Sequence, residues 1–299
     1  MKNITVSLIQ SSPVLFNLQA TLDKVERLAQ DAAKNNPNII VFPEAFIPAY
    51  PRGLSFGTVV GSRSELGRET WLKYWENCIA VPSAESDRLG SIAKKVNAYI
   101  VIGVVERGDT GTLYCTMLYY NPKGELIGTH RKLKPTAAER IIWGEGDGSD
   151  IDVYETEIGK MGGLICWENY MPLARTHIYS QGVELYIAPT ADMRDSWQAT
   201  MRHIATEGRC FVLGCNQFVK KEEYPELPGE DYSDFPDIMS RGGSVIVDPL
   251  GSVIAGPIFD EEAILTAELD MSLLAKGKMD FDPVGHYARN DVFELKKLK

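Results

Sequence analysis

The chain has 299 residues, and 31 lysines and arginines against 41 aspartates and glutamates give it a net charge of −10. This acidic balance has no general attraction for phosphate backbones or anionic lipid, which argues against a nucleic-acid or membrane role. With 44% hydrophobic and 24% charged residues, the composition is that of a folded globular protein and excludes a disordered chain.

Strand-like and helix-like segments alternate through the first half of the chain. The β-rich run Ile4–Ile9 predicts a strand, and Asn17 can cap a helix whose apolar residues recur at helical spacing from Leu18 to Ala32. A short apolar run at 38–42 is typical of a strand buried on both faces. Further along, the pattern predicts helices near Glu65–Ile79 and Glu85–Val96 and strands at Tyr99–Val105, Leu113–Tyr120 and Glu125–Thr129, the last two joined by a turn at Asn121–Gly124.

The second half repeats this alternation and then changes to consecutive strands. Its expected elements are strands at Met161–Ile165, Glu184–Ala188 and Cys210–Asn216 and helices at Pro172–Gln181 and Ser196–Gly208. The prolines and acids of Lys220–Asp237 indicate a solvated loop. An antiparallel meander is expected from Gly243–Val247, Ser252–Ile254 and Ala263–Leu269. The whole pattern predicts a mixed sheet in a layered α/β fold.

Cysteine and histidine usage argues against disulfides and metal sites. The five cysteines are odd in number and contain no C-x-x-C pair, and the four histidines are scattered. The N-terminal apolar run is too short for a signal peptide, and no stretch approaches the ~20 apolar residues that span a bilayer. We therefore expect a cytoplasmic protein with reduced thiols that needs no metal or cofactor.

Chemically interesting residues follow three of the predicted strands, where α/β sheets usually carry their functional groups. Glu44 comes directly after a buried run, so it is either a desolvated and basic carboxylate or a solvated turn acid. The bases at 130–136 form either an ordered loop or a solvated face. Cys166 is either a packed small residue or, just before a helix, a nucleophile near N–H groups that favour its thiolate.

Together these motifs are more specific than each one alone. Val-Phe-Pro-Glu-Ala, His-Arg-Lys-Leu-Lys-Pro-Thr and Cys-Trp-Glu-Asn resemble the nitrilase superfamily of carbon–nitrogen hydrolases, and the last motif resembles its nitrilase branch. The resemblance extends from Ile4 to about Phe293. It implies a four-layer αββα sandwich with mixed sheets. Because motifs from Glu44 to Cys166 and beyond must then meet in one site, residues 1–299 are expected to form a single domain, although their number would also suit two domains of about 150 residues.

The resemblance also implies the roles of individual residues. Cys166 is the nucleophile, Glu44 the general base, Lys132 the residue that stabilises developing charge and donates a proton, and Glu139 the residue that orients Lys132. A nitrile would pass through a covalent thioimidate and then a thioester. Five further residues are expected to bind substrate, with a core position as the less favoured alternative for Trp167. They are Tyr50, Trp167, Thr190, Ala191 and Met193.

Other functions share some of these features. An amidase or carbamoyl hydrolase would use the same thiol, and a cyanide-hydrating enzyme is a narrower variant of a nitrilase. A non-catalytic assembly module is disfavoured because all four implied catalytic residues are present. The resemblance also implies dimers, and possible spirals, with contacts through Leu54–Glu69 and Lys220–Asp237. The chain departs from the family in having Ala137 where an imidazole is common and in ending at Lys299, soon after Phe293.

Overall fold

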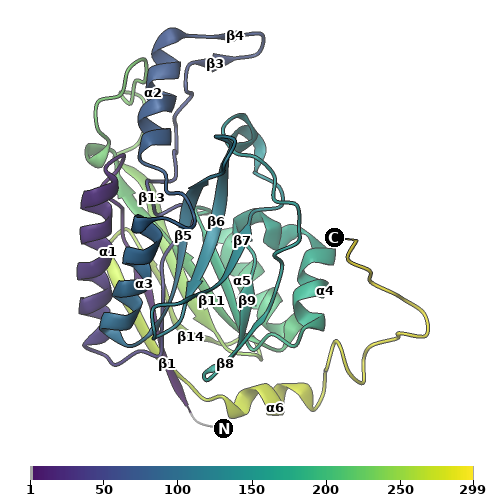
Figure 1. Cartoon of the computed structure of the whole chain (residues 1–299). Coiled ribbons are helices and arrows are strands. Elements are labelled where there is room, and N and C mark those ends of the chain that lie inside the picture. The colour runs from purple at the N-terminus through teal and green to yellow at the C-terminus, as the bar shows by residue number, and fades with distance from the viewer. Residues whose placement is uncertain (1–2, 299) are drawn as a thin grey trace.

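A computed structural model describes residues 3–298, which fold into two β-sheets packed face to face with helices on both outer faces (Figure 1). The layers therefore follow the expected αββα order. The first sheet has the strand order β15-β1-β2-β5-β6-β7. Its strands are β1 (Ile4–Gln10), β2 (Ile39–Val41), β5 (Tyr99–Arg107), β6 (Leu113–Tyr120), β7 (Leu126–Arg131) and β15 (Ala263–Leu269).

The second sheet has the order β12-β13-β11-β10-β9-β8, and β14 also pairs with β13. Its strands are β8 (Tyr154–Thr156), β9 (Gly159–Gly163), β10 (Leu185–Thr190), β11 (Phe211–Asn216), β12 (Phe218–Lys220), β13 (Ile238–Val247) and β14 (Val253–Phe259). Both sheets are mixed: parallel pairs β1–β2, β2–β5, β9–β10 and β10–β11 form their centres, and antiparallel pairs complete them.

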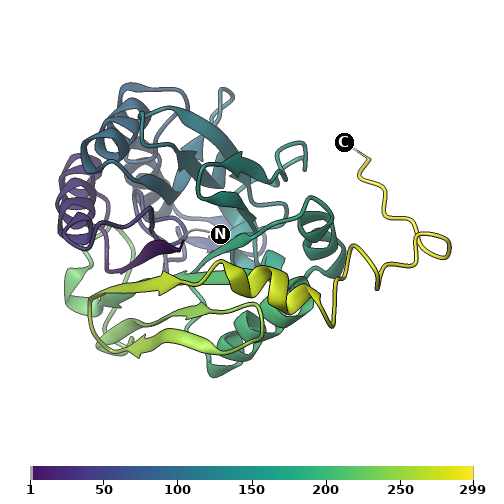
Figure 2. The same ribbon diagram turned by 90° about the horizontal axis from the view of Figure 1, so that it is seen from below.

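Two helix pairs cover the sheets. The first sheet packs against α1 (Leu18–Ala33) and α3 (Ala84–Val96), and the second against α4 (Pro172–Ser180) and α5 (Asp195–Gly208). The predicted cap of α1 is present, since the Asn17 side chain accepts the Ala20 N–H at 3.1 Å. A small hairpin, β3 (Thr58–Val59) and β4 (Ser62–Arg63), leads into α2 (Glu65–Glu76) at the top of Figure 1. Helix α6 (Ser272–Lys278) leads into a C-terminal segment that loops out from the sandwich (Figure 2) and returns to it, since Lys297 Nζ donates to the Ser149 carbonyl at 3.3 Å.

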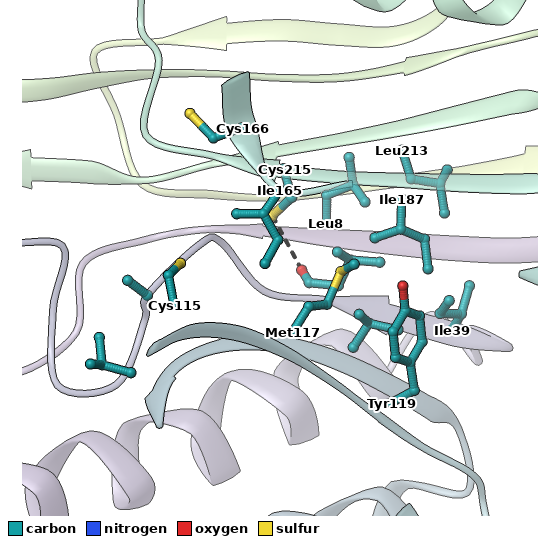
Figure 3. Packing of buried hydrophobic residues seen from close by; sticks show 14 of the residues in the cluster. Leu8, Ile39, Cys115, Met117, Tyr119, Ile165, Cys166, Ile187, Leu213 and Cys215 are labelled. Atoms are coloured by element: carbon teal, nitrogen blue, oxygen red, sulfur yellow. Dashed lines mark hydrogen bonds between the residues drawn. The ribbon is translucent and has the colours of Figure 1, made fainter. Parts of the chain in front are cut away.

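The main core lies between the two sheets. Figure 3 shows Leu8, Ile39 and Met117 of the first sheet facing Ile187 and Leu213 of the second. Strand β2 is buried on both faces, as its apolar run predicted, because Ile39 and Val41 face the other sheet while Ile40 faces the helices.

The structure corrects two expectations from the sequence. Strand β15 does not complete a meander with β14; it pairs with β1 along its whole length and so joins the other sheet. The segment 220–237 is not simply a solvated loop, because Leu227 is buried and Tyr224 and Tyr232 pack on the core. Sequence patterns also missed several short elements: β3, β4, β8, β12 and α6. No helix within residues 3–298 is long and apolar enough to span a membrane.

Candidate active site

The predicted catalytic side chains come from both sheets and meet at one end of the sandwich. Glu44 follows β2, Lys132 follows β7, and both strands belong to the first sheet. Cys166 lies just beyond β9, and Thr190 ends β10, the parallel neighbour of β9 in the second sheet. Figure 3 shows Cys166 and Cys115 toward the same end of the core, where the facing sheets both contribute to the site.

Glu44 is held against β5 by backbone hydrogen bonds on either side of it. The Gly103 N–H donates to the Pro43 carbonyl at 3.1 Å, and the Phe46 N–H donates to the Gly103 carbonyl at 2.8 Å. The chain turns sharply at Ala45, which has a φ of 45°. The approach is so close that a Cβ on Gly103 would lie 2.6 Å from the Glu44 Cα. A glycine at this position lets the carboxylate reach the interior.

Lys132 is fully buried between two carboxylates. Its Nζ donates to Glu44 Oε1 at 2.6 Å and to Glu139 Oε2 at 2.8 Å. Burial would lower the pKa of Lys132, but the nearby negative charges, Glu44 first among them, hold it well above its ordinary value. The Tyr50 hydroxyl donates to Glu139 Oε1 at 2.7 Å and fixes that carboxylate from the other side. Lys132 is therefore an ammonium that cannot move far from Glu44.

Cys166 begins a short 3₁₀ helix, Cys166–Tyr170, in a left-handed conformation with a φ of 50°. Strain of this kind is common at functional sites, where it aims a side chain that a relaxed backbone would point elsewhere. The Thr190 hydroxyl donates to the Cys166 sulfur at 3.1 Å. The Ala191 N–H donates to Glu44 Oε2 at 3.0 Å and so joins the base to the strand beside the nucleophile.

The resting protonation states follow from this charge balance. Burial raises the pKa of the Cys166 thiol and the charge of Glu44 raises it further, while Lys132 and the hydrogen bond from Thr190 lower it without reversing the shift. Burial also raises the pKa of Glu44, against the opposing charge of Lys132. The cluster already holds two carboxylates and one ammonium, so a thiolate would add a second net negative charge. The sequence suggested N–H groups near Cys166 that favour its thiolate; the structure instead gives a thiol beside a carboxylate able to take its proton.

A cavity of about 310 Å³ opens above the sulfur. Tyr50, Trp167, Ala191 and Met193, which the sequence suggested as substrate-binding residues, all line it. Thr190 lies beneath the sulfur instead and is fully buried. Trp167 is 40% exposed, so it is not a core residue.

Sequence reasoning missed several groups near this cavity. Arg52 lines the wall and donates to the Ala191 carbonyl. Asp192 accepts the Trp167 indole N–H at 2.9 Å and pairs with Arg194, whose guanidinium lies 4.7 Å from the Trp167 ring centroid. Asp192 and Arg194 follow the end of β10, which was a signal for them, whereas Arg52 lies in the long connection between β2 and β3. Within residues 3–298, no cluster of histidine, cysteine and acidic side chains is arranged to hold a metal ion.

Comparison with known proteins gives matches in family, in sequence and in fold. A model of the carbon–nitrogen hydrolase family matches residues 5–279. An aliphatic nitrilase of Sinorhizobium fredii is 51% identical over 296 residues, covering 99% of this chain and 96% of that protein. A bifunctional nitrilase/nitrile hydratase of Nicotiana tabacum is 50% identical over 297 residues, covering 98% of this chain and 85% of that protein. Among solved structures, a carbon–nitrogen hydrolase of Helicobacter pylori has the same fold, with a TM-score of 0.75 at 19% identity over 97% of this chain and 96% of that one.

Proposed function

The chain belongs to the carbon–nitrogen hydrolase family, and we propose that it hydrolyses an organic nitrile to the carboxylic acid and ammonia with Cys166 as nucleophile. Relatives named as nitrilases match nearly its whole length at about half identity, and the chain is accordingly a nitrilase. One observation carries the proposed roles: the ammonium of Lys132 is held between the carboxylates of Glu44 and Glu139. Of this cluster, Glu139 lines the same cavity as the Cys166 thiol, while Glu44 and Lys132 lie buried behind them.

The first step makes a carbon–sulfur bond. A nitrile carbon is a modest electrophile and needs a strong, soft nucleophile. As the Cys166 sulfur attacks, Glu44 takes the thiol proton and passes it on to the nitrile nitrogen, which gives a thioimidate and returns Glu44 to its carboxylate form. Because the proton moves during the attack, the buried cluster never has to hold a thiolate and two carboxylates at once. The raised pKa of Glu44 suits it to this transfer.

The next steps add two water molecules. Glu44 removes a proton from the first water as its oxygen adds to the thioimidate carbon, and Lys132 stabilises the charge that develops there. Glu44 gives the proton taken from water to the amino nitrogen, and expulsion of ammonia then leaves a thioester on Cys166. The second water, activated in the same way, releases the carboxylic acid and restores the thiol. Glu139 orients Lys132 through the 2.8 Å contact between their charged groups.

The tetrahedral adduct formed by the first water has a second route. If it expels the sulfur instead of ammonia, the product is the amide. The name of the Nicotiana relative, a bifunctional nitrilase/nitrile hydratase, supports a share of amide in this chain's products.

A panel of aliphatic, aromatic and arylacetonitriles, each with its matched amide, tests the function. Acid, amide and ammonia are measured separately for the parent and for Cys166→Ala. We expect acid and ammonia from at least one nitrile, and no turnover by Cys166→Ala. Faster ammonia release from the matched amides than from every nitrile would identify an amidase or carbamoyl hydrolase instead, and activity confined to cyanide would identify a cyanide-hydrating enzyme.

We also propose self-association through the β3–β4 hairpin. The two segments suggested by the sequence lie side by side, since Glu230 accepts the Phe56 N–H at 2.7 Å and the Thr70 hydroxyl donates to the Pro228 carbonyl at 2.6 Å. Beside them is a cavity of about 890 Å³ whose lining mixes apolar residues, among them the exposed Val60, with Arg63, Arg68 and Arg140. Clustered exposed apolar side chains rimmed by polar ones support an interface here. Light scattering should give at least a dimer, and a monomer at micromolar concentration would contradict the proposal.

We also propose that the chain forms a single domain and is located in the cytoplasm. The contacts between the sheets support a single domain, because the main core takes residues from both. All five cysteines are buried and free of disulfides, which supports a cytoplasmic location.

A further inference from the structure

The side chain of Glu168 contacts both chain segments that carry the reacting groups. Its Oε1 accepts the Leu133 N–H at 2.6 Å, and Leu133 directly follows Lys132. Its Oε2 accepts the Ile165 N–H at 2.7 Å, and Ile165 directly precedes Cys166. Glu168 is only 1% exposed, so these backbone contacts are made out of water, where hydrogen bonds to a charged group are strong.

No strand pairing duplicates this connection. Strand β7, which leads to Lys132, is the edge of the first sheet, and β9, which leads to Cys166, belongs to the second. Within residues 3–298, therefore, no β-ladder joins the two strands. The carboxylate of Glu168 bridges the gap between them directly at the positions where their catalytic residues emerge.

A buried imidazole holds this carboxylate in place. His130 Nε2 lies 2.9 Å from Glu168 Oε2 and 3.2 Å from Oε1, and its Nδ1 lies 3.4 Å from Asp150 Oδ1. Burial would lower the pKa of His130, but Glu168 and Asp150 together raise it to about 10, so the ring is an imidazolium that donates on both sides.

The same network fixes the backbone around Lys132. Asp150 Oδ2 accepts the Arg131 N–H at 2.7 Å, and the Cys115 carbonyl accepts the Lys132 N–H at 2.8 Å. With the Leu133 N–H bound by Glu168, three successive N–H groups have partners at the end of β7. The lysine side chain therefore leaves from a backbone with little freedom.

Only a carboxylate can make both backbone contacts of Glu168. A glutamine of the same shape has one acceptor oxygen, and its amide nitrogen would face an N–H group that has lost its partner. An aspartate is one methylene shorter and cannot reach both segments. The two backbone contacts of Glu168 thus explain why a glutamate is needed at this position. Burial of the side chain alone would not explain it.

We propose that Glu168, held by His130, is a positioning residue that fixes Lys132 relative to Cys166 and thereby sets the rate of turnover. The effect on the rate of turnover rests on the proposed nitrilase function, whereas the effect on the relative positions of Lys132 and Cys166 does not. Glu168 does not border the cavity above the sulfur, so its loss acts through Lys132 and Cys166 and not through substrate binding.

The test compares Glu168→Gln with Glu106→Gln. Glu106 is a buried carboxylate that pairs with the Arg131 side chain and accepts the Thr116 hydroxyl, but it makes no hydrogen bond to the backbone at Lys132 or Cys166. Both variants lose one buried negative charge. For each, kcat is expressed per molecule with a titratable Cys166, together with KM and the rate at which iodoacetamide alkylates Cys166.

For Glu168→Gln we expect kcat to fall on the order of 100-fold with KM nearly unchanged, as a displacement of about 1 Å can produce. Alkylation of Cys166 should slow roughly tenfold, because a displaced Lys132 no longer lowers the pKa of the thiol. Glu106→Gln should keep the parent kcat. A Glu168→Gln enzyme within twofold of the parent, a rise in KM alone, or an equal loss in both variants would overturn the proposal.

A second variant covers the case in which Glu168→Gln does not fold. His130→Gln leaves both backbone contacts of Glu168 but removes the cation that holds its carboxylate, and we expect kcat to fall roughly tenfold with KM unchanged. Unchanged kcat in His130→Gln would then overturn the proposal. If the parent turns over no nitrile at all, the proposed function fails, and the alkylation rates alone still decide the positioning role.

Discussion

Gly103→Ala perturbs the catalytic base without altering any catalytic side chain. Gly103 lies in β5 opposite the turn that carries Glu44. An added Cβ would lie 2.4 Å from the Pro43 carbonyl oxygen and 2.6 Å from both the Ala45 nitrogen and the Glu44 Cα. All of these are backbone atoms, so no side chain can rotate to make room.

The size of the effect follows from these distances. Ordinary van der Waals contact between carbon and oxygen begins near 3.4 Å, so the turn must retreat by about 1 Å. The contacts of Glu44 to Lys132 and Ala191 are 2.6 and 3.0 Å, and they cannot both survive such a shift. We expect kcat/KM to fall on the order of 100-fold. Overpacking should lower the free energy of unfolding by about 1–3 kcal/mol.

The assay measures kcat/KM on the best nitrile of the panel, together with denaturant unfolding. Gly277→Ala is a matched control, because a Cβ at this buried glycine of α6 would meet only ordinary contacts of 3.5 Å or more. It should keep full activity and gain up to about 1 kcal/mol from higher helix propensity. A folded Gly103→Ala enzyme with activity within twofold of the parent would refute the reasoning about Glu44.

Three further predictions concern the charges around the site. Thr190→Val removes the hydroxyl that donates to the Cys166 sulfur, so the pKa of the thiol should rise. The pH profile of Cys166 alkylation should then move to higher pH, with about two- to tenfold slower alkylation at neutral pH. An unmoved profile would contradict this prediction. Iodoacetamide followed by peptide mass mapping should modify Cys166 at least about tenfold faster than the other four thiols, because it alone borders the cavity above it; equal rates would contradict its assigned role. The pKa of His130 is about 10 in the fold against about 6.5 when unfolded, so its stabilising contribution is complete below pH about 6.5 and disappears as pH rises through about 10. The stability difference between the parent and His130→Gln should therefore shrink between pH 7 and 10, and a constant difference in denaturant unfolding would contradict the charged pair.

Local patterns predicted much of the fold because they depend on neighbouring residues. The alternation at Ile4–Ile9 and the helical spacing after Asn17 each specify which face is buried, and both elements form where expected. Which strand a given strand pairs with depends on residues far away in the sequence, so it does not follow from local patterns. The predicted antiparallel pairing of β13 with β14 is present, but nothing in the residues of β15 distinguishes pairing with β1 from pairing with β14, so the third strand of the predicted meander was wrong.

In the candidate site, too, sequence motifs identified individual residues but not the contacts that depend on distant parts of the chain. Motifs pointed to Glu44, Lys132 and Cys166, and the structure brings their side chains into one cluster. The function of Glu168 in joining two strands of different sheets was not visible, because an acid after a cysteine and a tryptophan has the composition of a surface turn. Similarly, His130 was indistinguishable from its basic neighbours until the fold buried it between two carboxylates.

A covalent intermediate on Cys166 is the central requirement of the proposed mechanism. The enzyme is mixed with a slow nitrile, quenched in acid during turnover and mapped by mass spectrometry of its peptides. We expect the added mass of a thioimidate or thioester on the peptide that contains Cys166, and neither adduct nor turnover in Cys166→Ala. Steady acid production by Cys166→Ala, or an adduct on a different cysteine, would contradict it.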